Sequence, residues 1–253
     1  MKIFALTGAG ASAESGLGTF RDKDGLWSRF DPMKLATPEA FAHNPDEVHA
    51  FYNMRRQNLL SAEPNAAHRA LARLEAGLAE RGGSLFLCTQ NIDDLHERAG
   101  SQRVVHMHGE LLKARCTACG GTMPWHEDLS VEVPCPSCRC SGGLRPHVVW
   151  FGEMPLEMDA IYDALLGADL FVAIGTSGSV YPAAGFVSEA RGHGIRTCEI
   201  NLEPSDNARR FDEGRYGPAS EVVPAWVEQV LSSRSSSDHG GFPAPGSSHV
   251  NGR

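Results

Sequence analysis

Four cysteines in the middle of the chain constrain its folding more than any other feature. Two Cys-x2-Cys pairs stand fifteen residues apart, and they are formed by Cys116, Cys119, Cys135 and Cys138. This spacing matches the four-cysteine zinc template, in which each pair brings two thiolates to one tetrahedral ion. A structural zinc ion can contribute roughly 10–16 kcal/mol to the folding of such a segment. The pattern therefore predicts a closed module with one structural zinc ion. The nearby Cys140 is expected to be a non-ligand, and the alternative is that it competes with Cys138.

The rest of the composition is that of an ordinary globular protein. The chain has 253 residues, 42% of them hydrophobic, so one large domain or one domain with an inserted module fits. Its net charge of −8 argues against broad binding to a phosphate backbone. No apolar run approaches the roughly 20 residues of a membrane helix, and Met1–Ala5 lacks the features of a signal peptide. We therefore expect a cytoplasmic protein, in which Cys88 and Cys198 are reduced core residues.

Short apolar runs separated by helical stretches predict an α/β fold. Six runs are expected to be buried strands, at Ile3–Thr7, Ser84–Thr89, Val104–His106, Val148–Phe151, Ala168–Gly175 and Arg196–Asn201. Helices are expected within Thr37–Arg81, with breaks at Pro38, Pro45 and Pro64, and at Met158–Leu166 and Ala183–His193. The alternation favours a Rossmann-like parallel sheet with right-handed crossovers. Residues 232–253 are rich in serine and glycine and predict a disordered tail.

A glycine-rich turn follows the first predicted strand. Gly8-Ala-Gly-Ala-Ser-Ala13 fits the G-x-G-x-x-G/A pattern, which brings backbone N–H groups to a pyrophosphate at the start of a helix. Alone, the pattern is also compatible with a plain strand-to-helix turn. Gly16 and Gly18 should end the helix after about one turn, and a long loop through Trp27 follows. That sequel is unusual for a dehydrogenase.

Further motifs, taken in chain order, resemble the sirtuin family. The opening signature runs from Gly8 to Asp22, and Thr89-Gln-Asn-Ile-Asp93 and His108-Gly109 are similar to the second and third motifs. The four cysteines, Val148-Val-Trp-Phe-Gly-Glu153, Gly175-Thr-Ser177 and Asn201-Leu-Glu203 follow in the family's order. The likeness covers residues 3–231. Segments 144–155 and 180–185 resemble the bacterial CobB-type, desuccinylase-like class of the family.

The resemblance implies an NAD-consuming protein-lysine deacylase rather than a hydride-transfer enzyme. In such a family, NAD lies across a Rossmann-like domain, and acyl-lysine enters between that domain and a small zinc-bearing one. The acyl oxygen attacks the ribose carbon that carries nicotinamide, and the products are free lysine, nicotinamide and an O-acyl-ADP-ribose. The large domain is expected at residues 1–30, 72–112 and 144–231, the helical module at 31–71 and the zinc ribbon at 113–143. Acyl-lysine proteins are the implied partners of an expected monomer, with no membrane and no specific nucleic acid.

The same resemblance implies the site residues. His108 matches the general base on a ribose hydroxyl, a task that an imidazole with a pKa of about 6.5 suits near neutral pH. Without the resemblance, His108 is better explained as a packed histidine at a strand end, and with His106 it suggests a metal pair that lacks a third ligand. The implied cofactor-binding residues are Gly8, Ala9, Gly10, Ser12, Glu14, Phe20, Arg21, Trp27, Gln90, Asn91, Ile92, Asp93, Gly175, Thr176, Ser177, Asn201, Leu202, Glu203 and Ala219.

Two residues of a helix-like stretch bear on acyl preference. Tyr52 and Arg55 are three apart and share a helix face. In the desuccinylase-like class, Tyr-x-x-Arg recognises the terminal carboxylate of a succinyl or malonyl group, through charge-assisted hydrogen bonds of roughly 1.5–3 kcal/mol each. Without the resemblance, Arg55 would be an exposed helical arginine, like the neighbouring Arg56. Val149 and Phe151 are the other implied substrate contacts.

Two other functions stay open on the sequence alone. The first is a dehydrogenase. This hypothesis is supported by the glycine turn alone, and it predicts hydride transfer. A zinc-ribbon nucleic-acid binder would use the small basic patch of Arg115, Arg139 and Arg145, although the net charge of −8 opposes it. Salt-sensitive DNA binding would support the second function.

Overall fold

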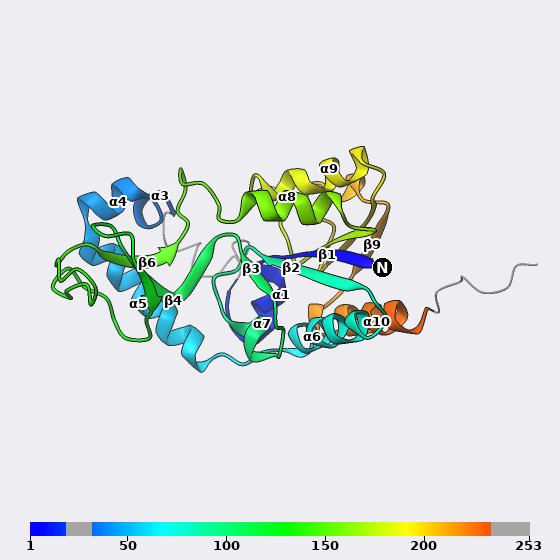
Figure 1. Cartoon of the computed structure of the whole chain (residues 1–253), viewed down its shortest axis with the longest axis horizontal. Coiled ribbons are helices and arrows are strands. Elements are labelled where there is room, and N and C mark those ends of the chain that lie inside the picture. Colours follow the sequence, from blue (N-terminus) through cyan, green and yellow to red (C-terminus); the bar gives the residue numbers. More distant parts are fainter. Residues whose placement is uncertain (19–31, 234–253) are drawn as a thin grey trace, which may run out of the picture.

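A six-stranded sheet forms the body of the molecule in the computed structural model, which describes residues 1–18 and 32–233. Its strand order is β3-β2-β1-β7-β8-β9, and every neighbouring pair is parallel (Figure 1). The strands are β1 (Lys2–Thr7), β2 (Ser84–Thr89), β3 (Val104–His106), β7 (Leu170–Ile174), β8 (Arg196–Asn201) and β9 (Glu213–Tyr216). The predicted α/β class is confirmed, and five of the six expected strands are present.

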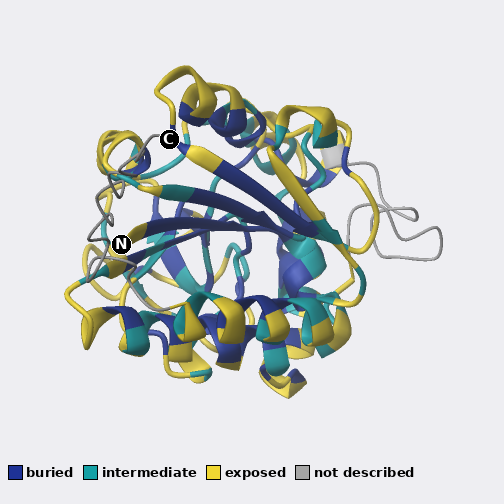
Figure 2. Ribbon diagram, turned by 90° about the vertical axis from the view of Figure 1, so that its right-hand side faces the viewer, coloured by how far each residue is buried: buried dark blue, intermediate teal, exposed yellow. Residues whose placement is uncertain are grey.

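Helices cover both faces of this sheet, which explains why its central strands β1, β2 and β7 are largely apolar. Ile3 and Ala5 of β1 pack with α6 (Ala66–Ala79) and α10 (Ala219–Ser232). Phe4 and Leu6 point to the other face, against α8 (Met158–Leu166) and α9 (Phe186–Gly192). Figure 2 shows the buried strands between the two helical layers. Cys88 and Cys198 are buried in β2 and β8, as predicted.

A second, antiparallel sheet lies to one side of the first (Figure 1). Its order is β5-β4-β6, with β4 at Gly109–Cys116, β5 at Thr122–Pro124 and β6 at Leu144–Val148. Helix α5 (Pro45–Ser61) packs on it through Leu59, beside α3 (Pro32–Leu35) and α4 (Pro38–His43). The domain boundaries at 112/113 and 143/144 stay a prediction, and β4 and β6 pair with each other across them.

The predicted strand Val148–Phe151 is wrong beyond its first residue. Strand β6 ends at Val148 because the chain then turns. The backbone N–H of Trp150 donates to the Glu153 carboxylate at 2.8 Å, and Gly152 takes a left-handed φ of 89°. These interactions replace the ladder that an extended strand would need.

Prolines and a capping asparagine set the helix starts in segment 37–81. Pro38 and Pro45 begin α4 and α5, at positions where a helix needs no backbone N–H donor. Asn65 caps α6 by accepting from the N–H groups of Ala67 and His68. The remaining helical elements are α1 (Ala9–Ser12), η1 (Ala13–Ser15), α7 (Leu95–Arg98), η2 (Ala183–Gly185) and η3 (Ala208–Arg210). Across the described ranges, no helix combines the length and apolar character needed to cross a membrane.

Candidate active site and metal centre

The glycine turn lies where the strand order of the large sheet reverses. Strands β1 and β7 are neighbours there, and the crevice beyond their carboxyl ends is where open α/β sheets bind ligands. The N–H of Gly10 donates to the carbonyl of Gly175 at 2.9 Å. A Cβ on Gly8 would lie 2.8 Å from Gly175 O, and one on Gly10 would lie 2.7 Å from Gly175 Cα. Only glycine fits these positions. Gly16, with a φ of 84°, then ends the short helical segment as predicted.

Three polar side chains lie beneath this turn. Ser12 donates to Oδ2 of Asp93 and accepts from Nδ2 of Asn91, both at 3.0 Å. The same Asn91 nitrogen donates to the carbonyl of Gly8 at 3.1 Å. Burial raises the pKa of Asp93, although hydrogen bonds from Leu95 N–H and Ser12 oppose that shift. The network fixes two predicted nicotinamide-side residues against the glycine turn.

His68 supports this network, and the sequence analysis did not identify it. Its Nδ1 accepts from the N–H of Asn65 at 3.2 Å, so in the neutral ring Nε2 carries the proton and donates to Ser12 Oγ at 3.3 Å. Burial lowers the pKa of His68 to about 4, which keeps the ring neutral. The Asn-x-x-His spacing at the start of a helix was the available signal, because it forms a capping box.

His108 lies between β3 and β4, next to the end of β2. Its Nδ1 is 3.0 Å from the carbonyl oxygen of Gln90, which can only accept a hydrogen bond. In the neutral ring Nδ1 therefore carries the proton, and Nε2 keeps its lone pair. Burial lowers the pKa of His108, with the Gln90 carbonyl acting in the opposite direction. The residue is held in the protonation state that a general base requires.

His106 does not pair with His108 on a metal. Its Nε2 is 2.7 Å from Oε1 of Glu97, and its Nδ1 is 3.4 Å from the carbonyl of Asn91. Burial opposes protonation, but Glu97 outweighs it and raises the pKa of His106. His106 therefore holds the backbone of Asn91 in place. Ile92, the next residue, accepts the N–H of Leu111 through its carbonyl at 2.8 Å.

The ends of β7 and β8 bring another predicted group together. Asn201 donates through Nδ2 to the carbonyl of Thr176 at 2.8 Å and accepts the N–H of Leu202 at 3.0 Å. Ser177 Oγ lies 2.8 Å from the Oγ of Ser179. Leu202 and Glu203 are exposed at this edge. These residues border the same crevice as the glycine turn.

Glu14 contacts the start of α10, beside Ala219. Both oxygens of Glu14 accept from Ser220, one from its N–H at 2.8 Å and one from its hydroxyl at 2.6 Å. Ser220 follows Ala219 in the first turn of α10, so the carboxylate faces the helix N-terminus. Ala9 precedes Gly10 in α1. Of the other predicted cofactor residues, Phe20, Arg21 and Trp27 lie outside the described residues.

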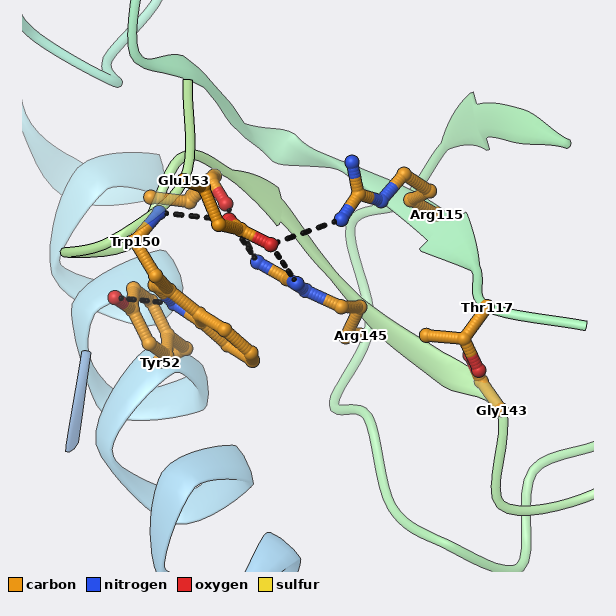
Figure 3. Close-up of polar contacts among 8 residues, drawn as sticks. Tyr52, Arg115, Thr117, Gly143, Arg145, Trp150 and Glu153 are labelled. Atoms are coloured by element: carbon orange, nitrogen blue, oxygen red, sulfur yellow. Dashed lines mark hydrogen bonds and ion pairs between the residues drawn. The ribbon is translucent and has the colours of Figure 1, made fainter. Parts of the chain in front are cut away.

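Helix α5 places Tyr52 and Arg55 in the small module, which consists of helices α3, α4 and α5 and the antiparallel sheet β5-β4-β6. Tyr52 is buried, and its hydroxyl accepts a hydrogen bond from Nε1 of Trp150 at 2.9 Å (Figure 3). The Arg55 guanidinium carbon lies 5.8 Å from the centroid of the Tyr52 ring. Burial raises the pKa of Tyr52 and lowers that of Arg55. The two residues share a face, as predicted.

Two other predictions in this region have different outcomes. Arg56 is wrong as an exposed arginine. It is fully buried, because its Nε donates to the carbonyl of Leu111 at 3.3 Å and its Nη1 to Asn53 at 2.8 Å. The N–H of Val149 donates to the carbonyl of His108 at 2.9 Å, and Phe151 is 45% exposed. The predicted substrate segment is thus joined directly to His108.

The four predicted cysteines converge at the end of the small sheet. Their sulfur atoms all lie within 4.8 Å of one another, with 3.7 Å between Cys116 and Cys138 and 3.9 Å between Cys119 and Cys135. Zn–S bonds of about 2.3 Å in a tetrahedron require sulfur atoms about 3.8 Å apart. The site fits one structural zinc ion. Cys140 is not in the cluster, and its carbonyl accepts the N–H of Cys135 at 2.9 Å.

Comparisons with known proteins agree on one family. Residues 8–182 match the Sir2 family. An NAD-dependent protein deacylase of Caulobacter vibrioides is 68% identical over 231 residues, covering 91% of this chain and 97% of that protein. One of Escherichia coli K12 is 57% identical and covers 91% and 82%, respectively.

Solved structures give the same result. A Sir2 homologue in complex with NAD superposes with a TM-score of 0.81 at 40% identity, covering 91% of both chains. A variant Sir2 homologue bound to ADP-ribose has a TM-score of 0.83 at 40% identity, with 90% and 91% covered.

Proposed function

Since this chain belongs to the Sir2 family and is an NAD-dependent protein deacylase, we propose that it removes acetyl, succinyl and malonyl groups from protein lysines. The proposed products are free lysine, nicotinamide and an O-acyl-ADP-ribose. One observation carries the proposal. His108, whose neutral imidazole has an unprotonated Nε2, accepts the N–H of Val149 through its backbone carbonyl, and Val149 follows strand β6 of the module that holds Tyr52 and Arg55.

The crevice is proposed to hold NAD, because it lies at the carboxyl ends of the parallel strands and is lined by polar groups. When bound, NAD supplies a ribose carbon whose bond to nicotinamide is broken in the reaction. Gly8, Gly10 and Gly175 pack backbone against backbone, and the glycine turn that they form before α1 is proposed to receive the pyrophosphate. Asn91 and Asp93 are proposed for the nicotinamide side, and the polar groups after β7 and β8 for the phosphates and the adenine ribose.

His108 is proposed as the general base. Its Nε2 would accept the proton of a ribose hydroxyl, which makes the ring an imidazolium. The carbonyl of Gln90 would then stabilise that cation through the Nδ1–H bond it already accepts. Because burial lowers the pKa of His108, the base form predominates at neutral pH.

Tyr52 and Arg55 are proposed to recognise the acyl carboxylate. A guanidinium and a phenol on one helix face can each hydrogen-bond a carboxylate, whereas an acetyl group offers no such partner. Val149 and Phe151 are proposed to contact the substrate, and Phe20, Arg21, Trp27, Glu14 and Ala219 to contact NAD. Residues 1–30, 72–112 and 144–231 are proposed as the NAD-binding domain.

The acyl preference is tested by Arg55→Met on matched acetyl-lysine and succinyl-lysine peptides. We expect kcat/KM for the succinyl peptide to fall about 10- to 100-fold, the loss of one hydrogen bond to a charged group, while most deacetylation remains. Arg69→Met, at an exposed position of α6, serves as the matched control. Equal loss on both peptides would contradict the proposed recognition.

A further inference from the structure

Three residues that contact one another lie next to Tyr52, and one of them, Trp150, donates a hydrogen bond to its hydroxyl. We propose that Arg145, Trp150 and Glu153, together called the Trp150 stack, are positioning residues that direct the Tyr52 hydroxyl to the carboxylate of an acidic acyl group (Figure 3). This inference rests on the proposed acyl recognition and names the residues on which its geometry depends. None of the three is among the predicted site residues.

The base of the stack is an ion pair between the buried Arg145 and the partly exposed Glu153. Arg145 donates two parallel hydrogen bonds to Glu153, from Nη1 to Oε1 at 2.7 Å and from Nη2 to Oε2 at 2.9 Å. Its side chain is 4% exposed, and Nη2 also donates to the carbonyl of Val148 at 2.8 Å. Arg115 adds a longer contact to Glu153 at 3.3 Å from a more exposed position. A bidentate ion pair holds its two side chains in a single relative position, because a shift of either group leaves a charge without its partner.

This ion pair holds Trp150 at two points. The guanidinium carbon of Arg145 lies 3.2 Å from the centroid of the indole ring, within the range of a cation–π contact. The backbone N–H of Trp150 donates to Oε2 of Glu153 at 2.8 Å. Ring and backbone are therefore fixed by the same pair of charges.

Trp150 in turn determines how the Tyr52 hydroxyl is used. An indole N–H can only donate, so its 2.9 Å contact must occupy a lone pair of the phenol oxygen. The phenol hydrogen is left for an acceptor, and among the residues that the structure describes the hydroxyl has no second hydrogen-bond partner. Burial raises the pKa of Tyr52, so the phenol stays protonated. Arg55 lies beside the same ring, and an acyl carboxylate there meets both donors.

The direct test is Trp150→Phe, which keeps an aromatic ring but removes the Nε1–H donor. Kinetics on matched succinyl-lysine and acetyl-lysine peptides should show a fall of about three- to tenfold in kcat/KM for succinyl, through KM. The acetyl value should change less than about twofold, because an acetyl group has no carboxylate to place. Arg115→Gln is the matched control, since Arg115 contacts Glu153 but not Trp150, and it should leave the succinyl-to-acetyl ratio unaltered.

A double-mutant cycle with Tyr52→Phe separates positioning from general packing. If Trp150 acts through the phenol, Trp150→Phe has no further effect on the succinyl peptide once Tyr52 lacks its hydroxyl. Arg145→Lys keeps the charge but loses the two parallel bonds, and it should lower the ratio in the same direction. Thermal unfolding and zinc content identify any variant that fails to fold. The variants that do fold then decide whether the Trp150 stack positions Tyr52.

Two outcomes overturn the proposal, and they are distinguishable. Equal losses on both peptides, or effects of Trp150→Phe and Tyr52→Phe that add, mean that the stack only packs the module. If Tyr52→Phe and Arg55→Met themselves leave the ratio unaltered, the proposed acidic-acyl recognition fails, and the positioning role fails with it.

Discussion

The crevice of the parallel sheet and the small module beside it are held together by different forces. In the crevice, backbone packing of Gly10 on Gly175 determines the geometry of the turn, and the Ser12 hydroxyl holds Asn91 against it. In the small module, side chains and a metal site do so, through the four cysteines and the Trp150 stack. The crevice should therefore tolerate loss of the metal but not an added side-chain atom. The small module should tolerate such an atom but not loss of the metal.

Loss of zinc is the largest expected effect. Cys135→Ser, or chelation, should unfold the zinc ribbon, since such ions contribute roughly 10–16 kcal/mol to the segments they hold. Deacylation of every peptide should be lost. Hydrogen exchange should rise in residues 113–143 but not in β1 and β2, and Cys140→Ser should keep the metal because that residue is outside the cluster. Equal loss of protection in β1 would refute the independence of the two regions.

Acid should weaken the crevice through His68. Burial lowers its pKa to about 4, below the ordinary histidine value of about 6.5, so the folded protein binds this proton more weakly than the unfolded chain. Stability is therefore full above pH 6.5 and is lost as the pH falls toward 4, by about 3 kcal/mol for this group. Urea unfolding at both ends of that window should show a smaller fall for His68→Gln. Some loss of stability should remain in this variant, because burial also lowers the pKa of His96. The His96 ring centroid lies 4.8 Å from that of His68. An identical fall in both proteins would contradict the prediction.

An added methyl group at Gly10 is the smallest of the three effects on stability. Its Cβ would meet Gly175 backbone at 2.7 Å, so Gly10→Ala should cost about 1–3 kcal/mol and weaken NAD binding in calorimetry. Gly192 is the matched control. A Cβ there meets nothing within 4 Å at the end of α9, and Gly192→Ala should leave NAD binding unchanged. Unaltered NAD affinity in Gly10→Ala would show that the close packing does not shape the site.

Local sequence patterns predicted most of the crevice but less of the small module. Strands β2, β3 and β8 have their predicted ends, because an unbroken apolar run bounded by turn residues is typical of a strand buried on both faces. The zinc cluster was equally predictable, since its ligands are close in sequence.

Side chains that depend on distant partners were not predictable. Strand β6 contains Arg145, Pro146 and His147, a pattern unlike a buried strand, and it forms only by pairing with β4. Burial of Arg56 and Arg145 requires acceptors supplied by other segments, namely the carbonyl of Leu111 and the carboxylate of Glu153. His68 could be recognised locally as a capping residue of α6, but its contact with Ser12, 56 residues away, could not. No local rule contains such information.

The most direct test of the deacylase chemistry is product analysis by mass spectrometry. Acetyl-lysine and succinyl-lysine peptides would be incubated with and without NAD, using the native protein and His108→Ala, each shown to be folded and zinc-loaded. The account predicts NAD-dependent loss of both acyl groups, one nicotinamide released for each group lost, and neither reaction in the variant. Acyl loss without NAD, or no acyl loss from either peptide, would contradict it.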